Sequence, residues 1–307
     1  MPTTNAIILP PPLQRRVESI VLEFTRPGSS PEPDFARPAG EAALLPHDAV
    51  SWRVFKNPLA LFVGGVAAVI LELAEPRVRT GVWEHTAFRQ DPLLRLKRTG
   101  VAAMITVYGP RSQAETMIAG VTKMHARVSG VTPDGQAYRA DDPELLDWVY
   151  ATASFGFIEA YHAYVHAMDD ADRQRYWADG LASASLYGAT GAPASQRELD
   201  ELFEKMRGKL EASPVVLEFL EIMRRVPILP SPFGALQGLL LKAAVEIVPP
   251  WIRVRLGLDE RWDLRPWQRQ MVRRGGALAD RILLRSSPAV QSCRRLGLPD
   301  DYLYTRR

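Results

Sequence analysis

The stretch RSQAETMIAGVTKMHARVSG, residues 111–130, carries the clearest helix pattern in the chain. Ser112 and Glu115 have the spacing of a capping box, which marks a helix start, and Gly130 is typical of a helix end. We therefore predict a helix over residues 111–129. Seven of its residues recur at steps of three and four and form one continuous apolar stripe: Ala114, Met117, Ile118, Val121, Met124, His125 and Val128.

His125 is the one ionisable side chain on this stripe. The pattern thus predicts a histidine that projects from the core face of the helix between apolar neighbours. It has two interpretations. Either the imidazole belongs to the core and is hydrogen-bonded to a backbone carbonyl, or it is the neutral proximal iron ligand that a haem needs on an apolar wall. Periodicity alone favours the first interpretation.

The pattern after Ser51 is helical almost throughout, and only the short piece 136–139 suggests a strand. We predict an all-α fold with one irregular helical domain over residues 51–307. An extended arm over residues 1–50 precedes it, since residues 26–48 hold five prolines. The other predicted helices cover residues 51–56, 58–75, 91–97, 143–168, 170–188, 195–210, 214–225, 233–247, 249–256, 265–285 and 287–296.

Composition restricts the class of protein. The chain has 307 residues, 24% of them charged, which is ordinary for a globular protein. Cys293 is the only cysteine, so an internal disulfide and a cysteine-based zinc site are excluded. The longest apolar run, residues 59–71, is shorter than the roughly 20 residues of a membrane span, and no signal peptide is visible. We therefore expect a cytoplasmic protein.

Charge is distributed unevenly along the chain. Residues 253–307 contain thirteen arginines, no lysine and six acids, a net charge of +7 within a chain of net +3. Such a basic region suits peripheral contact with phospholipid head groups, or it is the solvated surface of ordinary helices, and the second interpretation is the more common. No basic motif with interleaved aromatic residues indicates nucleic-acid binding.

Six further segments stand out along the chain: LELAEPRVRTGVWEHTAF (71–88), DPLLRLKRT (91–99), VYGPRSQAE (107–115), HARVSG (125–130), YRADDPELLDWVYAT (138–152) and VPPWIRVRLGL (248–258). This series resembles the MpaB and latex-clearing-protein (rubber oxygenase) family of haem-b proteins. The segments occur in the family's order, and the resemblance spans residues 55–260, most of the chain.

This resemblance implies a globin-like helical core that holds one haem b, with His125 as the proximal iron ligand. An R-x-x-(K/R)-T pattern supplies distal-side or propionate-binding residues in the family, and here it reads Arg95, Arg98 and Thr99. These three residues share one helix face. Some rubber oxygenases carry a lysine at the position of Arg98 that approaches the iron. Since arginine has no lone pair to offer, we expect the sixth iron position to be open or water-filled.

Further site residues are expected on the neighbouring segments. Trp148 and Thr152 share a helix and would form part of the haem-facing wall, or simply of the core. Many family members read LQLAHP where this chain reads LELAEP, so Glu72 and Glu75 replace glutamine and histidine. A carboxylate in an apolar helix is costly unless it is paired. Glu72 is therefore a pocket acid or a partner of Arg95.

Glu84 and His85, in WEHTAF, are candidates for the pocket lining, or they form a helix cap and a surface pair. Asp142, followed by Pro143 and Glu144, has the composition of a helix start. Capping explains at least one of the paired carboxylates Asp141 and Asp142 without catalysis.

The resemblance implies an oxygenase that uses O2 on a hydrophobic, isoprenoid- or lipid-like substrate. Glu72 or Glu84 would serve as a base. One alternative is a non-catalytic helical protein that binds lipid or haem. A second is a non-haem metal enzyme, because Glu159, His162 and His166 read E-x-x-H-x-x-x-H. No second E-x-x-H accompanies this motif, and no nucleophile elbow, P-loop or dinucleotide fingerprint is present.

Overall fold

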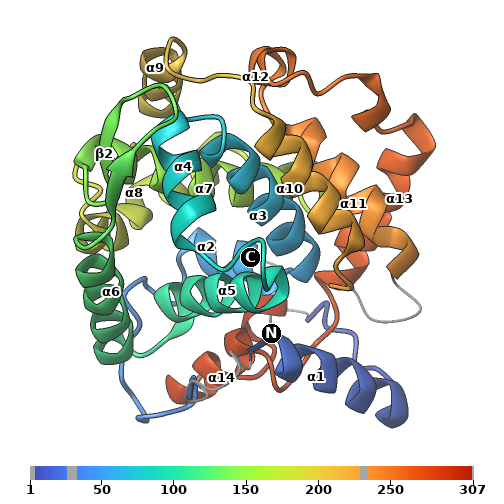
Figure 1. Cartoon of the computed structure of the whole chain (residues 1–307). Helices are drawn as coiled ribbons and strands as arrows, with labels where there is room; N and C mark the ends of the chain where they lie inside the picture. Colours follow the sequence, from blue (N-terminus) through green and yellow to red (C-terminus); the bar gives the residue numbers. More distant parts are fainter. Residues whose placement is uncertain (1–3, 26–32, 229–233, 306–307) are drawn as a thin grey trace.

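Two long apolar helices, α3 (Pro58–Glu72) and α7 (Pro143–Tyr164), pack against each other at the centre of the computed structural model. The structure describes residues 4–25, 33–228 and 234–305. Most of α3 is buried, because its sequence PLALFVGGVAAVILE is apolar on every side. Helices α4, α5 and α6 lie toward the viewer of Figure 1, and α11 and α13 lie at its right.

The described ranges contain fourteen α-helices and one two-stranded sheet, which confirms the predicted all-α fold. Around the central pair, α11 and α13 contact both α3 and α7, while α6 packs on α5 and α8. The remaining bounds are α1 (Pro11–Thr25), α2 (Val50–Lys56), α4 (Pro76–His85), α5 (Pro92–Tyr108), α6 (Arg111–His125), α8 (Asp170–Tyr187), α9 (Gln196–Met206), α10 (Pro214–Arg225), α11 (Gly234–Ile247), α12 (Pro250–Arg255), α13 (Pro266–Ala279) and α14 (Pro288–Arg295), with two short 3-10 turns at Glu260–Trp262 and Tyr302–Tyr304.

A small hairpin connects α6 to α7. Strand β1 (Ser129–Val131) pairs antiparallel with β2 (Ala137–Arg139), and Gly130 lies opposite Tyr138. The short strand predicted over residues 136–139 is confirmed. The hairpin packs against α4.

Capping residues followed by proline start many of the helices. Asn57, Asp91, Asp142 and Ser213 each accept a hydrogen bond from a backbone N–H in the first turn that follows, and proline occupies the next position. A side-chain oxygen there pairs a backbone donor that has no partner within the helix, and proline lacks the N–H that would need one. The start of α7 predicted at Asp142–Pro143 is confirmed by the hydrogen bond from Glu144 N (2.9 Å).

Several segments differ from the predictions. The helices predicted over 143–168, 195–210 and 265–285 end earlier, at Tyr164, Met206 and Ala279. Residues 11–25, placed in the extended arm, form α1, and residues 26–32 of that arm lie outside the described residues. Helix α4 was not predicted, because PRVRTGVWEH has no clear apolar period. Helix α5 continues beyond 97 to Tyr108, since Gly100 does not adopt the positive φ that ends many helices and Gly109 is the C-cap instead.

The segment before α2 is held to the other end of the chain. Arg295 of α14 is 2% exposed and donates to the carbonyls of Phe35 (2.6 Å), Glu41 (2.8 Å) and Tyr108 (2.7 Å).

Across the described ranges no single helix is both long and apolar enough to span a bilayer; α2 and α3 reach that length and composition only as a pair, bent by 98°.

Candidate functional site

Helix α6 carries His125 as its last residue. The helix starts at Arg111 after Pro110, and the capping box predicted from Ser112 and Glu115 does not form. Instead, Ser112 N donates to the Glu41 carboxylate (2.7 Å), and Glu115 pairs with Arg111. The predicted end at Gly130 is also wrong, because that glycine belongs to β1. His125 therefore lies where α6 gives way to the hairpin.

The imidazole of His125 is half-buried, and no described residue is hydrogen-bonded to it. Its Nδ1 atom is buried without a partner. Burial lowers the pKa of His125 below the ordinary 6.5, although the charge of Asp141 opposes the shift. A cation at a helix C-terminus is normally favoured, so desolvation outweighs the helix dipole here. The side chain is thus a neutral imidazole with an unused nitrogen, which is what an iron ligand requires.

The apolar stripe of α6 is covered only over its first half. Ala114 and Ile118 are buried in the core, whereas Val121 is half-buried and Met124 is 56% exposed. The protein therefore leaves apolar surface uncovered beside His125. The predicted stripe is confirmed in its spacing, but its second half does not face the core.

The R-x-x-R-T residues lie in the first two turns of α5. Arg95 is half-buried and lies over the ring of Phe88, 5.5 Å from its centroid, while Arg98 and Thr99 are exposed. The Thr99 hydroxyl donates to the Arg95 carbonyl (3.0 Å), a local bond within the helix. The structure thus places the three on neighbouring positions of α5, with Arg95 half-buried and the other two exposed.

Glu72, the last residue of α3, faces Arg95 electrostatically without touching it. Burial raises the pKa of the Glu72 carboxyl, and the positive charge of Arg95 opposes that shift. Burial likewise lowers the pKa of Arg95, and Glu72 opposes it. No ion pair within 4.0 Å joins either side chain to a described residue. The predicted pairing is therefore a long-range attraction between two desolvated groups.

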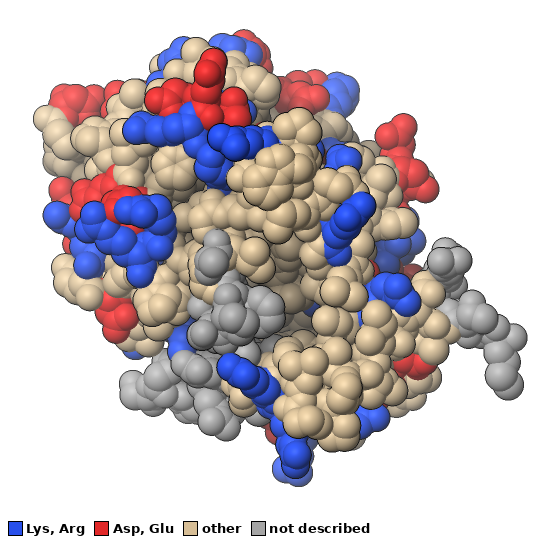
Figure 2. Space-filling view, turned by 90° about the vertical axis from the view of Figure 1, so that its right-hand side faces the viewer, with Lys and Arg blue, Asp and Glu red and all other residues tan. Residues whose placement is uncertain are grey.

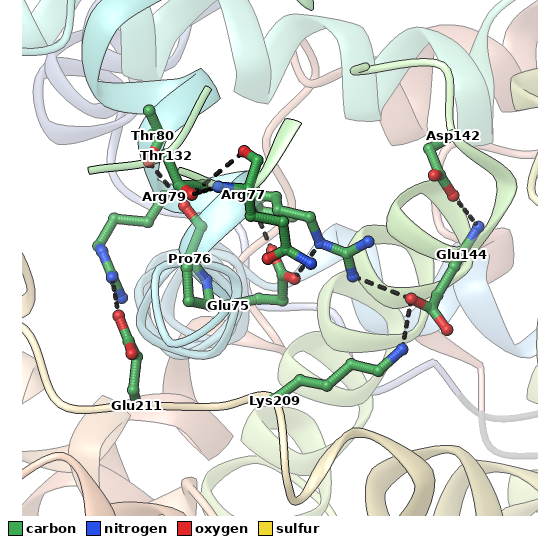
Figure 3. A network of polar contacts seen from close by, with 12 residues as sticks. Glu75, Pro76, Arg77, Arg79, Thr80, Thr132, Asp142, Glu144, Lys209 and Glu211 are labelled. Atoms are coloured by element: carbon green, nitrogen blue, oxygen red, sulfur yellow. Dashed lines mark hydrogen bonds and ion pairs between the residues drawn. The ribbon is translucent and has the colours of Figure 1, made fainter. Parts of the chain in front are cut away.

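Glu75 has a structural role, which Figure 3 shows. Only 1% exposed, its side chain caps α4 by accepting from Val78 N (2.8 Å) and from Arg77 Nε (2.6 Å). Arg77 also donates to Glu144 in the first turn of α7 (2.9 Å), and Lys209 donates to the same carboxylate (2.6 Å). These cations lower the pKa of Glu144 to about 2. The network joins the start of α4 to the start of α7.

Tyr138 is a buried residue that the sequence patterns did not single out. It fits between Gly81 of α4 and Gly130 of β1, where an added Cβ would lie 3.4 Å and 2.7 Å from its side chain. Its hydroxyl is buried without a partner. Burial raises the pKa of Tyr138, and the charge of exposed Glu84 adds to the shift. Glu84 thus lies near the hairpin that follows His125, and His85 beside it is exposed.

Asp141 is a second residue near His125 whose position was not predicted from the sequence. It forms an ion pair with Arg139 (2.8 Å), and the hydrogen bond from Arg139 is the main cause that lowers the pKa of Asp141; electrostatic interaction with His125 adds a smaller lowering. Asp142, its neighbour, is the cap of α7 as predicted. The fold of the hairpin brings the Asp141 carboxylate toward the His125 imidazole. The spacing of the two residues in the sequence therefore did not predict that they lie near each other.

Trp148 and Thr152 are fully buried on α7. The Trp148 ring packs on Phe203 of α9, with 5.2 Å between centroids, and its Nε1 has no partner. The Thr152 hydroxyl donates to the Trp148 carbonyl (2.9 Å) within the helix. These contacts are those of a helical core, and their assignment to a haem-facing wall stays a prediction.

Glu159, His162 and His166 do not come together as a metal site. Glu159 pairs with Arg173, and His162 Nδ1 accepts from Met168 N (3.0 Å). Helix α7 ends at Tyr164, so exposed His166 lies beyond it. In the part of the chain that the structure describes, no group of three or more histidine, cysteine, aspartate or glutamate side chains is arranged to hold a metal ion.

Comparison with known families bears on most of the chain. Residues 52–281 match the family described as "ER-bound oxygenase mpaB/B'/Rubber oxygenase, catalytic domain". The match runs from α2 through α13 and includes every candidate residue discussed above. No curated protein and no solved structure matches the chain.

Proposed function

The chain belongs to this family of oxygenase catalytic domains, and from that premise we propose that it is a haem b-dependent oxygenase. It binds one haem b per chain through His125, uses O2, and acts on a hydrophobic, isoprenoid- or lipid-like substrate. The observation that carries the proposal is the state of His125. Burial lowers its pKa and so favours the neutral imidazole, and its Nδ1 atom has no hydrogen-bond partner among the residues that the structure describes.

The surroundings of His125 support a haem at this position. A porphyrin needs apolar surface beside its ligand. The second half of the α6 stripe provides such surface, because Val121 is only half-buried and Met124 is exposed. Asp141 provides a carboxylate near the imidazole, and a negative charge there strengthens a histidine ligand. When bound, haem supplies the iron that binds O2 for the oxidation of the substrate.

In this proposal the chain's own acids and bases would act on the substrate. Glu72 has a raised pKa, so its carboxyl keeps a proton to higher pH than an exposed glutamate does. A carboxyl with a pKa raised in this direction is a candidate for proton transfer. Arg95 supplies a fixed positive charge facing Glu72, while exposed Arg98 and Thr99 are accessible to an incoming carboxylate or to the substrate. Glu84 remains the second candidate base.

The test is haem content. The purified chain, reconstituted with haem b and cleared of free haem, is expected to show a Soret band and one haem per chain by pyridine haemochrome assay. His125→Ala is expected to lose most of the bound haem, and added imidazole is expected to restore the band, because it replaces the missing ligand. His166→Ala is the matched control, since that exposed histidine lies outside the proposed site.

Two results contradict the proposal. A wild-type chain that takes up no haem excludes a haem enzyme, and unchanged haem content in His125→Ala assigns the iron to another ligand. Circular dichroism checks that the variant is folded. Oxygen uptake with apolar substrates then separates an oxygenase from a protein that only binds haem or lipid.

A further inference from the structure

The outward face of α13 and the adjoining part of α11 expose large apolar side chains. Trp267 is 57% exposed, Met271 45% and Leu278 54%, and Leu236 of α11 is 39% exposed beside them. Together these four residues are named here the α13 surface. A hollow of about 520 Å³ adjoins it, lined by apolar side chains that include Leu239, Trp262 and Met271 and by the cations Arg224, Lys242 and Arg261. A single exposed leucine is ordinary, but a contiguous cluster with tryptophan indicates a binding surface.

The two faces of α13 differ sharply. Val272 and Gly276 lie on the inner face, and an added Cβ on Gly276 would lie 2.2 Å from the carbonyl oxygen of Tyr164 in α7. Trp267, Met271 and Leu278 lie at positions i, i+4 and i+11, which share the opposite side. Helix α13 is therefore fixed to the core by one side, and its other side has an apolar stripe that no described residue covers.

Positive charge accompanies this stripe. Helix α13 and its N-cap contain four arginines and no acid: Arg265, Arg269, Arg273 and Arg274. Arg269 pairs with Glu246, and Arg273 donates to the Ala163 carbonyl (2.9 Å). Arg265 and Arg274 form no ion pair with any described residue. Figure 2 shows this side of the molecule, where uncharged surface occupies much of the middle and both Lys/Arg and Asp/Glu side chains lie around it.

We propose that the α13 surface docks onto the surface of an anionic lipid bilayer. Tryptophan prefers the interface between head groups and acyl chains, and arginine side chains at the edge contact phosphates while their stems stay in apolar surroundings. A second copy of the chain fits less well, because a face of this kind would place arginines opposite arginines. This proposal narrows the expected membrane contact of the basic C-terminal region to one helix face. It is independent of haem binding.

The test is co-sedimentation of the full chain with vesicles. The chain is expected to bind phosphatidylcholine vesicles that contain 30 mol% phosphatidylglycerol, and to bind phosphatidylcholine alone much more weakly. Arg265→Gln together with Arg274→Gln is expected to weaken binding about thirtyfold at low salt, from the contribution of two surface charges. The Trp267→Ser, Met271→Ser pair is expected to weaken binding to both kinds of vesicle, since it removes apolar contact.

The control is Val254→Ser with Leu186→Ser, which removes two exposed apolar residues outside the α13 surface and is expected to leave binding unchanged. Tryptophan fluorescence gives a second readout, because Trp267 is expected to shift to shorter wavelength on anionic vesicles. Equal binding by wild type and both α13 variants overturns the proposal. So does a dimer in sedimentation velocity that the Trp267, Met271 variant dissociates, since that result assigns the face to a second copy.

Discussion

Gly64 of α3 and Gly156 of α7 lie directly against each other where the two central helices cross. An added Cβ on Gly156 would lie 2.3 Å from the Gly64 carbonyl oxygen, and one on Gly64 would lie 2.7 Å from the Gly156 carbonyl oxygen. Both obstacles are backbone atoms, so neither can give way by a change of rotamer. The glycines therefore set the distance between the two helices that organise the rest of the fold.

Gly156→Ala is expected to destabilise the protein by about 2–4 kcal/mol, because the two helices must separate and lose packing. The free energy of unfolding in urea measures this loss. Gly65→Ala is the control on the facing helix α3, next to Gly64, since its Cβ would be 3.9 Å from the Phe157 ring. That change is expected to be neutral or stabilising by up to about 1 kcal/mol, from helix propensity. Equal losses in the two variants would show that the crossing is not the constraint.

Glu144 predicts a specific dependence of stability on pH. The pKa of Glu144 is lowered from 4.5 to about 2 by Lys209, Arg77 and Lys205. A carboxyl group with a lowered pKa contributes stability that is fully present above its unfolded pKa and is lost as pH falls toward the folded value. Glu144→Gln is therefore expected to cost about 1 kcal/mol at pH 7, a figure reduced for solvent screening. The difference from wild type is expected to disappear between pH 4.5 and 2.

The measurement is the unfolding free energy of both proteins across this range. Glu201→Gln removes an exposed i, i+4 pair with Arg197 and serves as the control; it is expected to change stability little at any pH. A difference between wild type and Glu144→Gln that stays constant down to pH 2 would contradict the assignment.

The hydrogen bonds from Arg295 are expected to hold the segment before α2 to the rest of the protein. Replacing Arg295 with methionine leaves the buried carbonyls of Phe35, Glu41 and Tyr108 without their donor, and the expected cost is about 3–5 kcal/mol. Chymotrypsin is expected to cleave after Phe35 faster in this variant. Arg294→Met, on exposed Arg294 next along α14, is the control and is expected to leave the cleavage rate unchanged.

Local signals predicted much of the helical framework. Helix α10 occupies the predicted residues 214–225, because Ser213 and Pro214 define its start and Pro227 follows its end. Helix α4 was missed for the opposite reason. Its buried residues include Arg79, which is held by Glu211 from a segment far along the chain. A buried arginine whose ion-pair partner is distant in the sequence interrupts the apolar periodicity by which a helix is predicted.

The site was predicted in part for the same physical reasons. The α6 pattern predicted His125 on the core face among apolar neighbours; in the structure its Nδ1 is buried, but the side chain is only half-buried and neighbouring Met124 is exposed. The pattern did not show that coverage stops after Ile118, since this depends on which helices pack across α6. The capping box at Ser112 failed because Glu41, distant in the sequence, takes the amide instead. The role of His125 as an iron ligand stays a prediction.

Glu72 gives the sharpest link between stability and function. Burial raises its pKa, so the folded state resists ionisation of a carboxyl that the unfolded chain ionises freely above pH 4.5. Stability is therefore lost as pH rises from 4.5 through the folded pKa. Glu72→Gln removes the charge and keeps the shape, so it is expected to stabilise the protein at pH 8 by about 1–3 kcal/mol. At pH 4 the two proteins are expected to be equally stable.

If Glu72 also transfers protons, the same variant is expected to lose oxygen uptake while its haem content stays unchanged. Thermal unfolding at pH 4 and pH 8 and oxygen uptake on the reconstituted protein measure the two effects separately. Glu115→Gln, on an exposed residue of α6, is the control for a charge change with neither effect. A Glu72→Gln protein that is less stable at pH 8 would show that the carboxylate is paired in solution. A Glu72→Gln protein that is stabilised and keeps full oxygen uptake would show that Glu72 is not the base, and Glu84 would then be the remaining candidate.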